Sequence, residues 1–392
     1  MLRLRDRLAG ERITFCCATT TRDLQEVQRF IRQHTALGID TESTGLNCYQ
    51  PGWKLRTVQF GNDVTSYVVP QRFHKFIAWA MRQPVKWIGH NGPHDIRSID
   101  EYLGFSTGVV CEGETYIPAH HADSRGAREG GTGHGLKELA EAHIDRDAGK
   151  WERELKRVFK SIEVPVPGEF YKSGPRKGLP KVRKARLDEG WGLIDPFHPA
   201  YIAYAAADPI LTYRVWRKFN PVYRSFRELY EFDHRVQMAC DRLQRRGIKL
   251  DISYTETVSE AFTRKANRYI ARAEGYGCRN IHSGQQIAAT LLELGAELTE
   301  YTPTGKYKTS DKILRDLAKA NAGDITEFIR CVLVAKQLLK RRENYSDAML
   351  REMDREGRVH ASINSLGART ARMSVSRPPL QQLPTKDRDD EE

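Results

Sequence analysis

The sequence has no long hydrophobic run. Hydrophobic residues make up 40% of its 392 residues, yet no apolar stretch approaches the roughly 20 residues that a helix needs to cross a bilayer. The first residues, MLRLRDRLAGER, alternate charge with leucine and lack the continuous apolar segment of a secretory signal. We therefore expect a cytoplasmic protein with no membrane partner.

Cysteines are few, and no two are spaced as a metal-binding pair. The seven are Cys16, Cys17, Cys48, Cys111, Cys240, Cys278 and Cys331. They are scattered, odd in number and never form C-x-x-C. This pattern suits reduced thiols and argues against a disulfide framework and against structural zinc.

Acidic residues are outnumbered by basic ones. The 51 Asp and Glu against 63 Lys and Arg give a formal net charge of +12. Such a surplus attracts a polyanion before any specific contact forms. Nucleic acid is the natural candidate, although charge by itself does not identify a ligand.

The first part of the chain alternates β-favouring and helical patterns. The predicted strands are 36–40, 55–60, 66–70 and 86–91, and the predicted helices are 74–83 and 94–103. The first three strands are separated by turn-forming residues, which predicts an antiparallel start. Strands that then alternate with helices indicate a mixed α/β sheet.

Residues 150–197 interrupt this pattern with five prolines among many charges, which predicts an inserted loop. Seven basic residues there have no acid between the first and the last: Lys172, Arg176, Lys177, Lys181, Arg183, Lys184 and Arg186. The loop is either a solvated linker or an arm that grips a nucleic-acid strand. A helical pattern returns at 198–219, and Pro209 predicts a kink or a division in it.

The second half of the chain is mainly helical. Helical patterns occupy 226–247, 283–295 and 324–353. Between the last two, the segment 297–310 is rich in β-favouring residues around Pro303, Thr304 and Gly305, which predicts a short hairpin.

Three pairs of polar residues lie in or next to predicted strands and helices of the first part of the chain. Asp40 and Glu42 lie two apart at the end of a strand, so both carboxylates share one face. Asn91, a good helix cap, ends another strand, and Asp95 follows in the opening turn of a helix. Tyr204 and Asp208 are one helical turn apart. Each pair alone is commonplace, but the set in this order is specific.

The residue types suit hydrolysis of a phosphodiester. Two divalent cations ~3.5–4 Å apart can activate a water and stabilise the leaving oxygen. Mg²⁺ and Mn²⁺ prefer oxygen ligands, so Asp40, Glu42, Asp95 and Asp208 would be their ligands. Tyr204, protonated at neutral pH, would orient the attacking water.

The chain resembles the amino-terminal part of a family A DNA polymerase of phage type. The segments that carry the resemblance are IDTESTGL at 39–46, HNGPHD at 90–95, GHGLKELA at 133–140 and YAAAD at 204–208. The resemblance implies a ribonuclease H-like 3′→5′ exonuclease domain of the tyrosine subclass. It also implies that Leu46 wedges against the terminal base and that Asn91 helps to hold the 3′ end.

The helical half resembles the thumb of such a polymerase. The likeness rests on SGQQIAATLLELG, on the hairpin PTGKYKTS and on the end segment GRVHASINSLGARTARMSVSRPPLQQLP. It implies that Lys306, Lys308, Arg372 and Gln381 contact primer-template DNA. The chain departs from the family pattern at Glu114, where Asp is more familiar, and at Ala371 and Pro379, where Gly and Asn are expected.

The resemblance predicts the domain order. Residues 1–222 are the exonuclease domain with its basic loop at about 150–197, residues 223–371 are the thumb, and residues 372–392 begin the palm and end in a charged tail. The palm carboxylates and the fingers lysine of the family have no counterparts here, so we expect a truncated or split polymerase. A separate palm-and-fingers chain is then a possible partner, in the host cytoplasm if the gene is viral.

Two other functions remain open. The chain could be a free-standing ribonuclease of the same catalytic type, although the thumb-like end segment argues against this. It could also be a non-catalytic DNA-binding subunit of a split polymerase. The histidine subclass of these nucleases is excluded, because its histidine would fall at Ala203.

Overall fold

A computed structural model describes residues 1–383 of the chain, and the predicted charged tail at 384–392 lies outside the described residues. By compactness the chain forms two units. The first comprises residues 1–246 and 363–374, and the second comprises residues 247–362 and the chain after 374. The helix α9 (Arg227–Arg246), which sequence analysis assigned to the thumb, is thus part of the first unit.

A seven-stranded mixed sheet forms the centre of the first unit, in the order β1-β2-β5-β4-β3-β6-β7. Its strands are β1 (Leu2–Leu8), β2 (Glu11–Cys17), β3 (Ala36–Ser43), β4 (Leu55–Gly61), β5 (Thr65–Pro70), β6 (Lys86–Gly89) and β7 (Gly113–Glu114). β3, β4 and β5 pair antiparallel, as predicted, whereas β6 pairs with β3 in parallel. The β1–β2 hairpin was not predicted, although its alternation of charge and leucine has the period of a strand.

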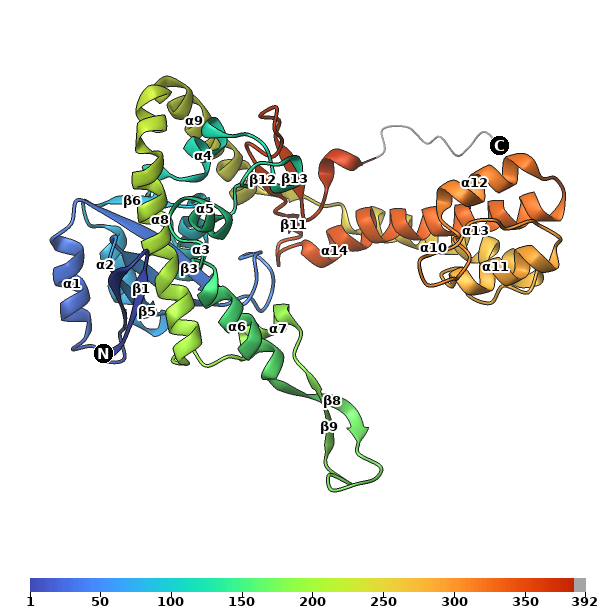
Figure 1. Cartoon of the computed structure of the whole chain (residues 1–392), viewed down its shortest axis with the longest axis horizontal. Helices are drawn as coiled ribbons and strands as arrows, with labels where there is room; N and C mark the ends of the chain where they lie inside the picture. The colour runs from blue at the N-terminus through green and yellow to red at the C-terminus, as the bar shows by residue number, and fades with distance from the viewer. Residues whose placement is uncertain (384–392) are drawn as a thin grey trace. The chain divides into compact units, whose positions relative to one another are not determined.

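Helices cover both faces of this sheet (Figure 1). One face packs against α1 (Leu24–Arg32), α2 (His74–Met81) and α3 (Pro93–Leu103). The other packs against α4 (Tyr116–Ala122), α5 (Leu136–His143), α6 (Lys150–Ser161) and α8 (Pro199–Ser225). Short 3₁₀ turns lie at Gln71–Phe73 and Ala127–Glu129. The result is a three-layer α/β/α arrangement with a hydrophobic core on each side of the sheet.

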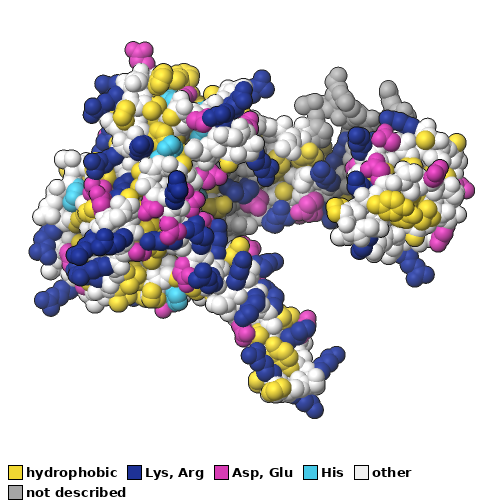
Figure 2. All heavy atoms as spheres, in the orientation of Figure 1, with side chains coloured by type: hydrophobic (Ala, Val, Ile, Leu, Met, Phe, Trp, Pro, Cys, Tyr) yellow, Lys and Arg dark blue, Asp and Glu magenta, His cyan; other side chains and the backbone are white. Residues whose placement is uncertain are grey.

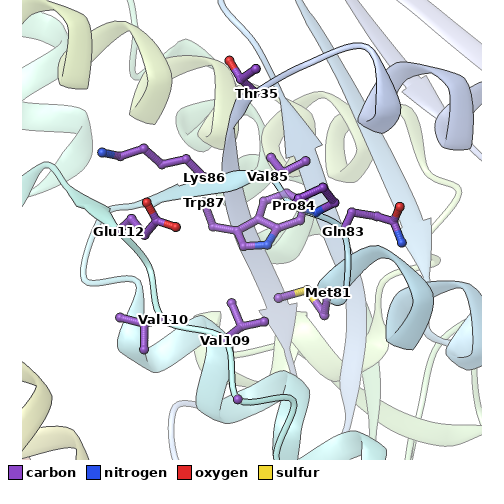
Figure 3. A pocket seen from close by; sticks show the side chains of 11 residues that line it. Thr35, Met81, Gln83, Pro84, Val85, Lys86, Trp87, Val109, Val110 and Glu112 are labelled. Atoms are coloured by element: carbon purple, nitrogen blue, oxygen red, sulfur yellow. The ribbon is translucent and has the colours of Figure 1, made fainter.

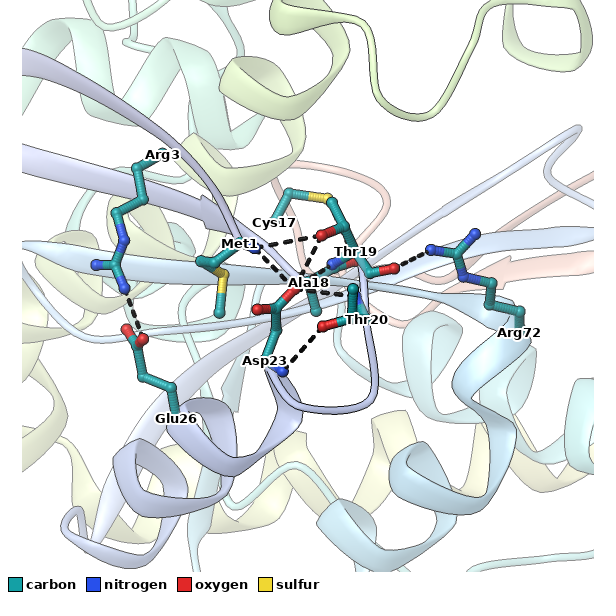
Figure 4. A network of polar contacts seen from close by, with 9 residues as sticks. All are labelled: Met1, Arg3, Cys17, Ala18, Thr19, Thr20, Asp23, Glu26 and Arg72. Atoms are coloured by element: carbon teal, nitrogen blue, oxygen red, sulfur yellow. Dashed lines mark hydrogen bonds and ion pairs between the residues drawn. The ribbon is translucent and has the colours of Figure 1, made fainter.

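The amino terminus is tied to the start of α1 by a polar network (Figure 4). The ammonium group of Met1 donates to the Asp23 carboxylate at 2.8 Å and to the Thr19 hydroxyl at 3.2 Å. The backbone N–H groups of Thr19 and Thr20 donate to the same carboxylate. The Met1 ammonium, together with these hydrogen bonds, lowers the pKa of Asp23. The network therefore fixes the sheet edge against α1.

The prediction of a loop at 150–197 was wrong. This segment contains α6, the strands β8 (Glu163–Phe170) and β9 (Pro180–Lys184), and α7 (Leu187–Leu193). α6 buries Trp151, Leu155 and Phe159 at a spacing of four residues, which is an amphipathic helix hidden among charges. β8 and β9 form an antiparallel hairpin whose alternate residues are partly covered.

The structure bears on two further expectations about helices. α8 is one helix that contains both Pro209 and Pro221, so the chain is not divided at Pro209. Packing of α8 along five strands of the sheet offsets the hydrogen bonds that the prolines remove. α3 begins at Pro93 with Gly92 in the capping position, and Asn91 is not its cap.

The second unit is mainly helical around its own hydrophobic core. Its elements are β10 (Ile248–Lys249), α10 (Ile252–Gly275), α11 (Gly284–Glu293), α12 (Asp311–Ala320), α13 (Asp324–Arg341), a π-helix (Arg342–Asp347), α14 (Ala348–Glu352) and β11 (Arg358–Val359). After β11 the described residues contain β12 (Ser362–Asn364), β13 (Ser374–Ser376) and a 3₁₀ turn (Leu380–Gln382). The predicted hairpin near Gly305 is confirmed by an antiparallel bridge between Tyr301 and Tyr307.

No helix of the described residues is long and apolar enough for a transmembrane span.

Candidate active site

β3 carries the first two acidic residues of the candidate site. Asp40 lies opposite Gln59 of β4, and Glu42 lies opposite Thr57. Because side chains alternate along a strand, both carboxylates lie on the same face of the sheet. Carboxylate oxygens of Asp40, Glu42 and Asp208 lie within 4.8 Å of one another. We call these three residues the carboxylate cluster.

α8 brings Tyr204 and Asp208 to this face, one turn apart. The helix can approach β3 closely because residue 38 is glycine. A Cβ atom at Gly38 would lie 2.3 Å from the carbonyl oxygen of Pro209. The distance between Asp208 and the two carboxylates of β3 therefore depends on the absence of a side chain at Gly38.

Asp95 is held beside the cluster by β3 itself. It lies in the first turn of α3 and is buried. Its carboxylate accepts a hydrogen bond of 2.6 Å from the hydroxyl of Thr41, which stands between Asp40 and Glu42 in the strand. Asp95 is thus next to the carboxylate cluster without being one of the three that gather within 4.8 Å.

The turn between β6 and α3 is supported from inside by Glu114. The backbone N–H groups of Asn91 and Gly92 both donate to the Glu114 carboxylate at 2.8 Å, and that of Tyr116 donates at 3.0 Å. Asn91 has a φ of 61° and an exposed side chain. The departure from the family pattern at Glu114 therefore falls on a residue that holds the turn leading to Asp95.

Burial changes the protonation of the acidic residues. Burial raises the pKa of Asp40 to about 7, although the charge of Lys137 acts in the opposite direction. Burial, followed by the charge of Asp40, raises the pKa of Glu42 and of Asp95 well above the usual range. Carboxylates gathered in this way are unfavourable unless cations compensate their charge.

The ring of Tyr204 is half-buried and lies between two neighbours. The ring centroid of Trp191 lies 5.5 Å from it, and the Nζ atom of Lys137 lies 4.7 Å above it. Burial, followed by the charges of Glu42 and Asp40, raises the pKa of the phenol well above its usual value. Tyr204 therefore keeps its proton near neutral pH and can donate a hydrogen bond.

Lys137 is a member of this site that sequence analysis did not find. Its ammonium forms an ion pair with Asp208, and the two side chains are only 17% and 8% exposed. Burial lowers the pKa of Lys137 to about 8, while the charges of Asp40 and Glu42 oppose this. The residue stands in the segment GHGLKELA, but only the packing of α5 on α8 turns it inward.

The remaining predicted residues lie outside the carboxylate cluster. Leu46 follows β3 and is 61% exposed. Arg372 is exposed and belongs to the first unit. Lys306, Lys308 and Gln381 belong to the second unit, where Lys308 forms an ion pair of 3.3 Å with Glu300.

A pocket of about 590 Å³ lies at the first residues of β6, the end of the strand that is farther from Asn91 and Asp95 in sequence (Figure 3). It is lined by residues 83–87 at the start of that strand and by residues 108–110 and Glu112 before β7, with Thr35 and Met81. Asn91 and Asp95 follow the other end of β6. The pocket is therefore not part of the carboxylate site.

Known families match both halves of the chain. Residues 16–158 match the 3′-5′ exonuclease family, and residues 252–392 match DNA polymerase family A. The helical half of the chain is thus similar to DNA polymerase family A, and the first half is similar to 3′-5′ exonucleases. The first match includes β3 and α3 of the site, and the second includes the helical unit.

Several curated polymerases are similar to this chain. The DNA polymerase of Mycobacterium phage L5 is 30% identical and that of Mycobacterium phage D29 is 28% identical, each over 400 residues and 99% of this chain. The DNA polymerase I of Chloroflexus aurantiacus is 28% identical over 195 residues, which are 47% of this chain and 20% of that protein. The chain spans 62% of the length of the two phage relatives.

A solved structure shares the fold. It is the POL domain of Pol1 from M. smegmatis in complex with DNA primer-template and dNTP, at a TM-score of 0.58 and 15% identity over 95% of this chain and 56% of that chain. The predicted fold class, a ribonuclease H-like exonuclease domain followed by a helical domain, is confirmed.

Proposed function

We propose that this chain is a 3′→5′ exonuclease that removes nucleotides from DNA ends, joined to the DNA-binding thumb of a family A polymerase. The observation that carries the proposal is the carboxylate cluster, which β3 and α8 bring within 4.8 Å beside Asp95. The match of residues 16–158 to the 3′-5′ exonuclease family supports it.

The donor set fits two divalent cations, Mg²⁺ or Mn²⁺. Asp40, Glu42, Asp95 and Asp208 offer only carboxylate oxygens, the ligands that these cations prefer. When bound, such cations would activate water and neutralise charge on the phosphate and the leaving oxygen.

Each residue of the site has a role in this proposal. The four acidic residues bind the cations, and the Tyr204 phenol donates a hydrogen bond that orients the attacking water. Leu46 and Asn91, both exposed near the site, contact the 3′-terminal nucleotide. Lys306, Lys308, Arg372 and Gln381 are proposed to contact the primer-template duplex.

Polymerisation is not proposed for these 392 residues by themselves, since the relatives that they match are longer. Nucleotide addition would come from palm and fingers residues on the same or a separate chain. The place of action is proposed to be the cytoplasm, of a host cell if the gene is viral.

The test is digestion of a 5′-labelled single-stranded DNA with Mg²⁺ or Mn²⁺, and with a chelator. We expect shortening from the 3′ end that stops with the chelator and in Asp40→Ala/Glu42→Ala. The variant Glu141→Ala, whose partly exposed side chain pairs with Arg153 of α6, is the control and should cleave normally. Undiminished cleavage by the double variant would contradict the assignment of the site, and a preference for RNA of the same sequence would favour a ribonuclease.

A further inference from the structure

Lys137 places a cation of the protein itself against the carboxylate cluster. It comes from the first turn of α5, and its ammonium pairs with Asp208. The same Nζ atom lies 4.7 Å from the ring centroid of Tyr204, on the preceding turn of α8. Its charge also acts on Asp40 and Glu42 of β3. One side chain thus reaches the acidic residues of both elements and the tyrosine.

A buried ammonium in this place has two consequences. It compensates part of the negative charge of carboxylates that would otherwise repel one another. It also fixes the rotamers of Asp208 and Tyr204, since an ion pair and a cation–π contact hold them from one side. Both effects operate before any metal is bound.

We propose that Lys137 is the resident cation of the nuclease site. It positions Asp208 and Tyr204 in the metal-free protein and releases Asp208 when a divalent cation binds there. This inference rests on the proposed function, because it takes the carboxylate cluster to be a metal site. Lys137 is a positioning residue in this account, and it is a competitor of the metal for Asp208.

The competition predicts an unusual effect of substitution. Lys137→Met keeps the apolar stem and removes the charge, so Mn²⁺ no longer has to displace an ammonium. We expect Mn²⁺ to bind the DNA-free Lys137→Met protein about tenfold more tightly than wild type, as measured by titration calorimetry. The rise in melting temperature on adding Mn²⁺ should also be larger, because tighter ligands stabilise the folded state more. Lys137→Arg, which keeps the charge, should stay close to wild type.

Lys150→Met is a matched control. Lys150 also pairs with a carboxylate, that of Asp6 at 3.1 Å, and its Nζ also lies 4.7 Å from an aromatic ring, that of Trp151. It makes both contacts away from the carboxylate cluster. Removing its charge should therefore leave Mn²⁺ affinity unchanged.

Equal or weaker Mn²⁺ binding by Lys137→Met would overturn the inference. If that variant does not fold, Lys137→Gln is measured in its place with the same expectation. The metal site and the role of Lys137 are tested separately. Wild type that binds no Mn²⁺, or whose binding survives Asp40→Ala/Glu42→Ala, contradicts the metal site itself. Wild type that binds normally while Lys137→Met behaves like wild type contradicts only the role of Lys137.

Discussion

A protonated phenol among carboxylates is the distinctive feature of this site at the scale of single residues. The pKa of Tyr204 is raised by burial and by Glu42 and Asp40, so the ring oxygen carries a proton that it can donate. The acidic side chains of the site can only accept hydrogen bonds when they are ionised. Tyr204 is thus suited to orient a water, and less suited to deprotonate one.

Tyr204→Phe should leave the fold intact and slow DNA hydrolysis by very roughly 10²-fold, because it deletes one positioned donor. The ring and its contact with Trp191 remain. Single-turnover digestion at saturating Mg²⁺ measures the effect, with Tyr201→Phe as a control on the same helix. Unchanged turnover of Tyr204→Phe would assign this residue to packing.

His90, beside the 91–95 turn, gives a pH-dependent contribution to stability. Burial, and to a lesser degree the charge of Lys137, lowers the pKa of His90 to about 4, whereas the unfolded chain has a pKa near 6.5. Between these values the unfolded state binds more protons than the folded state. The contribution of neutral, buried His90 to the free energy of unfolding is therefore complete above pH 6.5 and is lost as the pH falls towards 4.

His90→Gln should reduce the fall in melting temperature between pH 7 and pH 5. Measurements in chelator keep metal binding out of the comparison. The exposed His74, changed to Gln, is the control and should keep the wild-type slope. A slope for His90→Gln equal to that of wild type would show that His90 does not set the acid sensitivity.

At the scale of elements, the β8–β9 hairpin carries most of the basic segment 172–186 and exposes apolar side chains (Figure 2). Phe170 and Leu179 are 58% and 56% exposed. Several of its cations are paired within the hairpin or with α7: Lys181 with Glu169, Arg183 with Glu189, and Lys184 with Glu163. Lys172 and Lys177 form no ion pair within the part of the chain that the structure describes. These two lysines are the ones left for a phosphate backbone.

Lys172→Ala/Lys177→Ala should flatten the plot of log affinity for single-stranded DNA against log salt, by about 0.7 for each phosphate that the protein no longer neutralises. The alanine triple variant of Lys181, Arg183 and Lys184 is the comparison. Because removing these cations leaves their acidic partners unpaired, we expect a smaller change in slope for each charge removed. Fluorescence anisotropy at several salt concentrations gives both slopes. If neither variant alters the slope, the hairpin is a solvated element that does not touch the strand.

At the scale of the whole molecule, the chain combines two compact units with separate hydrophobic cores. The hairpin around Gly305 in the second unit has two lysines that differ in their ion pairing. Lys308 is paired with Glu300, whereas the exposed Lys306 has no ion pair within residues 1–383. A duplex held by this unit should therefore depend more on Lys306.

Lys306→Ala should weaken binding of a primer-template duplex by a few-fold and leave cleavage of single-stranded DNA unchanged, since the nuclease residues are in the other unit. Lys308→Ala is the matched comparison on the same hairpin, and we expect a smaller loss. Both activities are measured on the same protein preparation. Loss of single-strand cleavage in Lys306→Ala would show that this hairpin also acts on single-stranded DNA.

Much of the chain could be predicted from its sequence, because the relevant signals are local. The period of two in β3 places Asp40 and Glu42 on one face, and the spacing of four in α8 does the same for Tyr204 and Asp208. The turn residues at Gly305 predict the hairpin that the structure contains. The helices α2, α3, α9 and α11 follow from apolar periodicity.

Other features were decided only by packing between distant segments. The charges of α6 conceal its buried stripe of Trp151, Leu155 and Phe159, which is recognisable only once α8 lies against it. The continuation of α8 past Pro209 depends on the sheet on which the helix packs. Lys137 looks like a solvent-facing lysine in sequence, and it enters the site because α5 packs on α8. The sequence alone determined the residue types and the face of each strand or helix on which they lie, because backbone geometry fixes these faces. The tertiary structure decided which charges meet, because burial and proximity arise only between elements far apart in the chain.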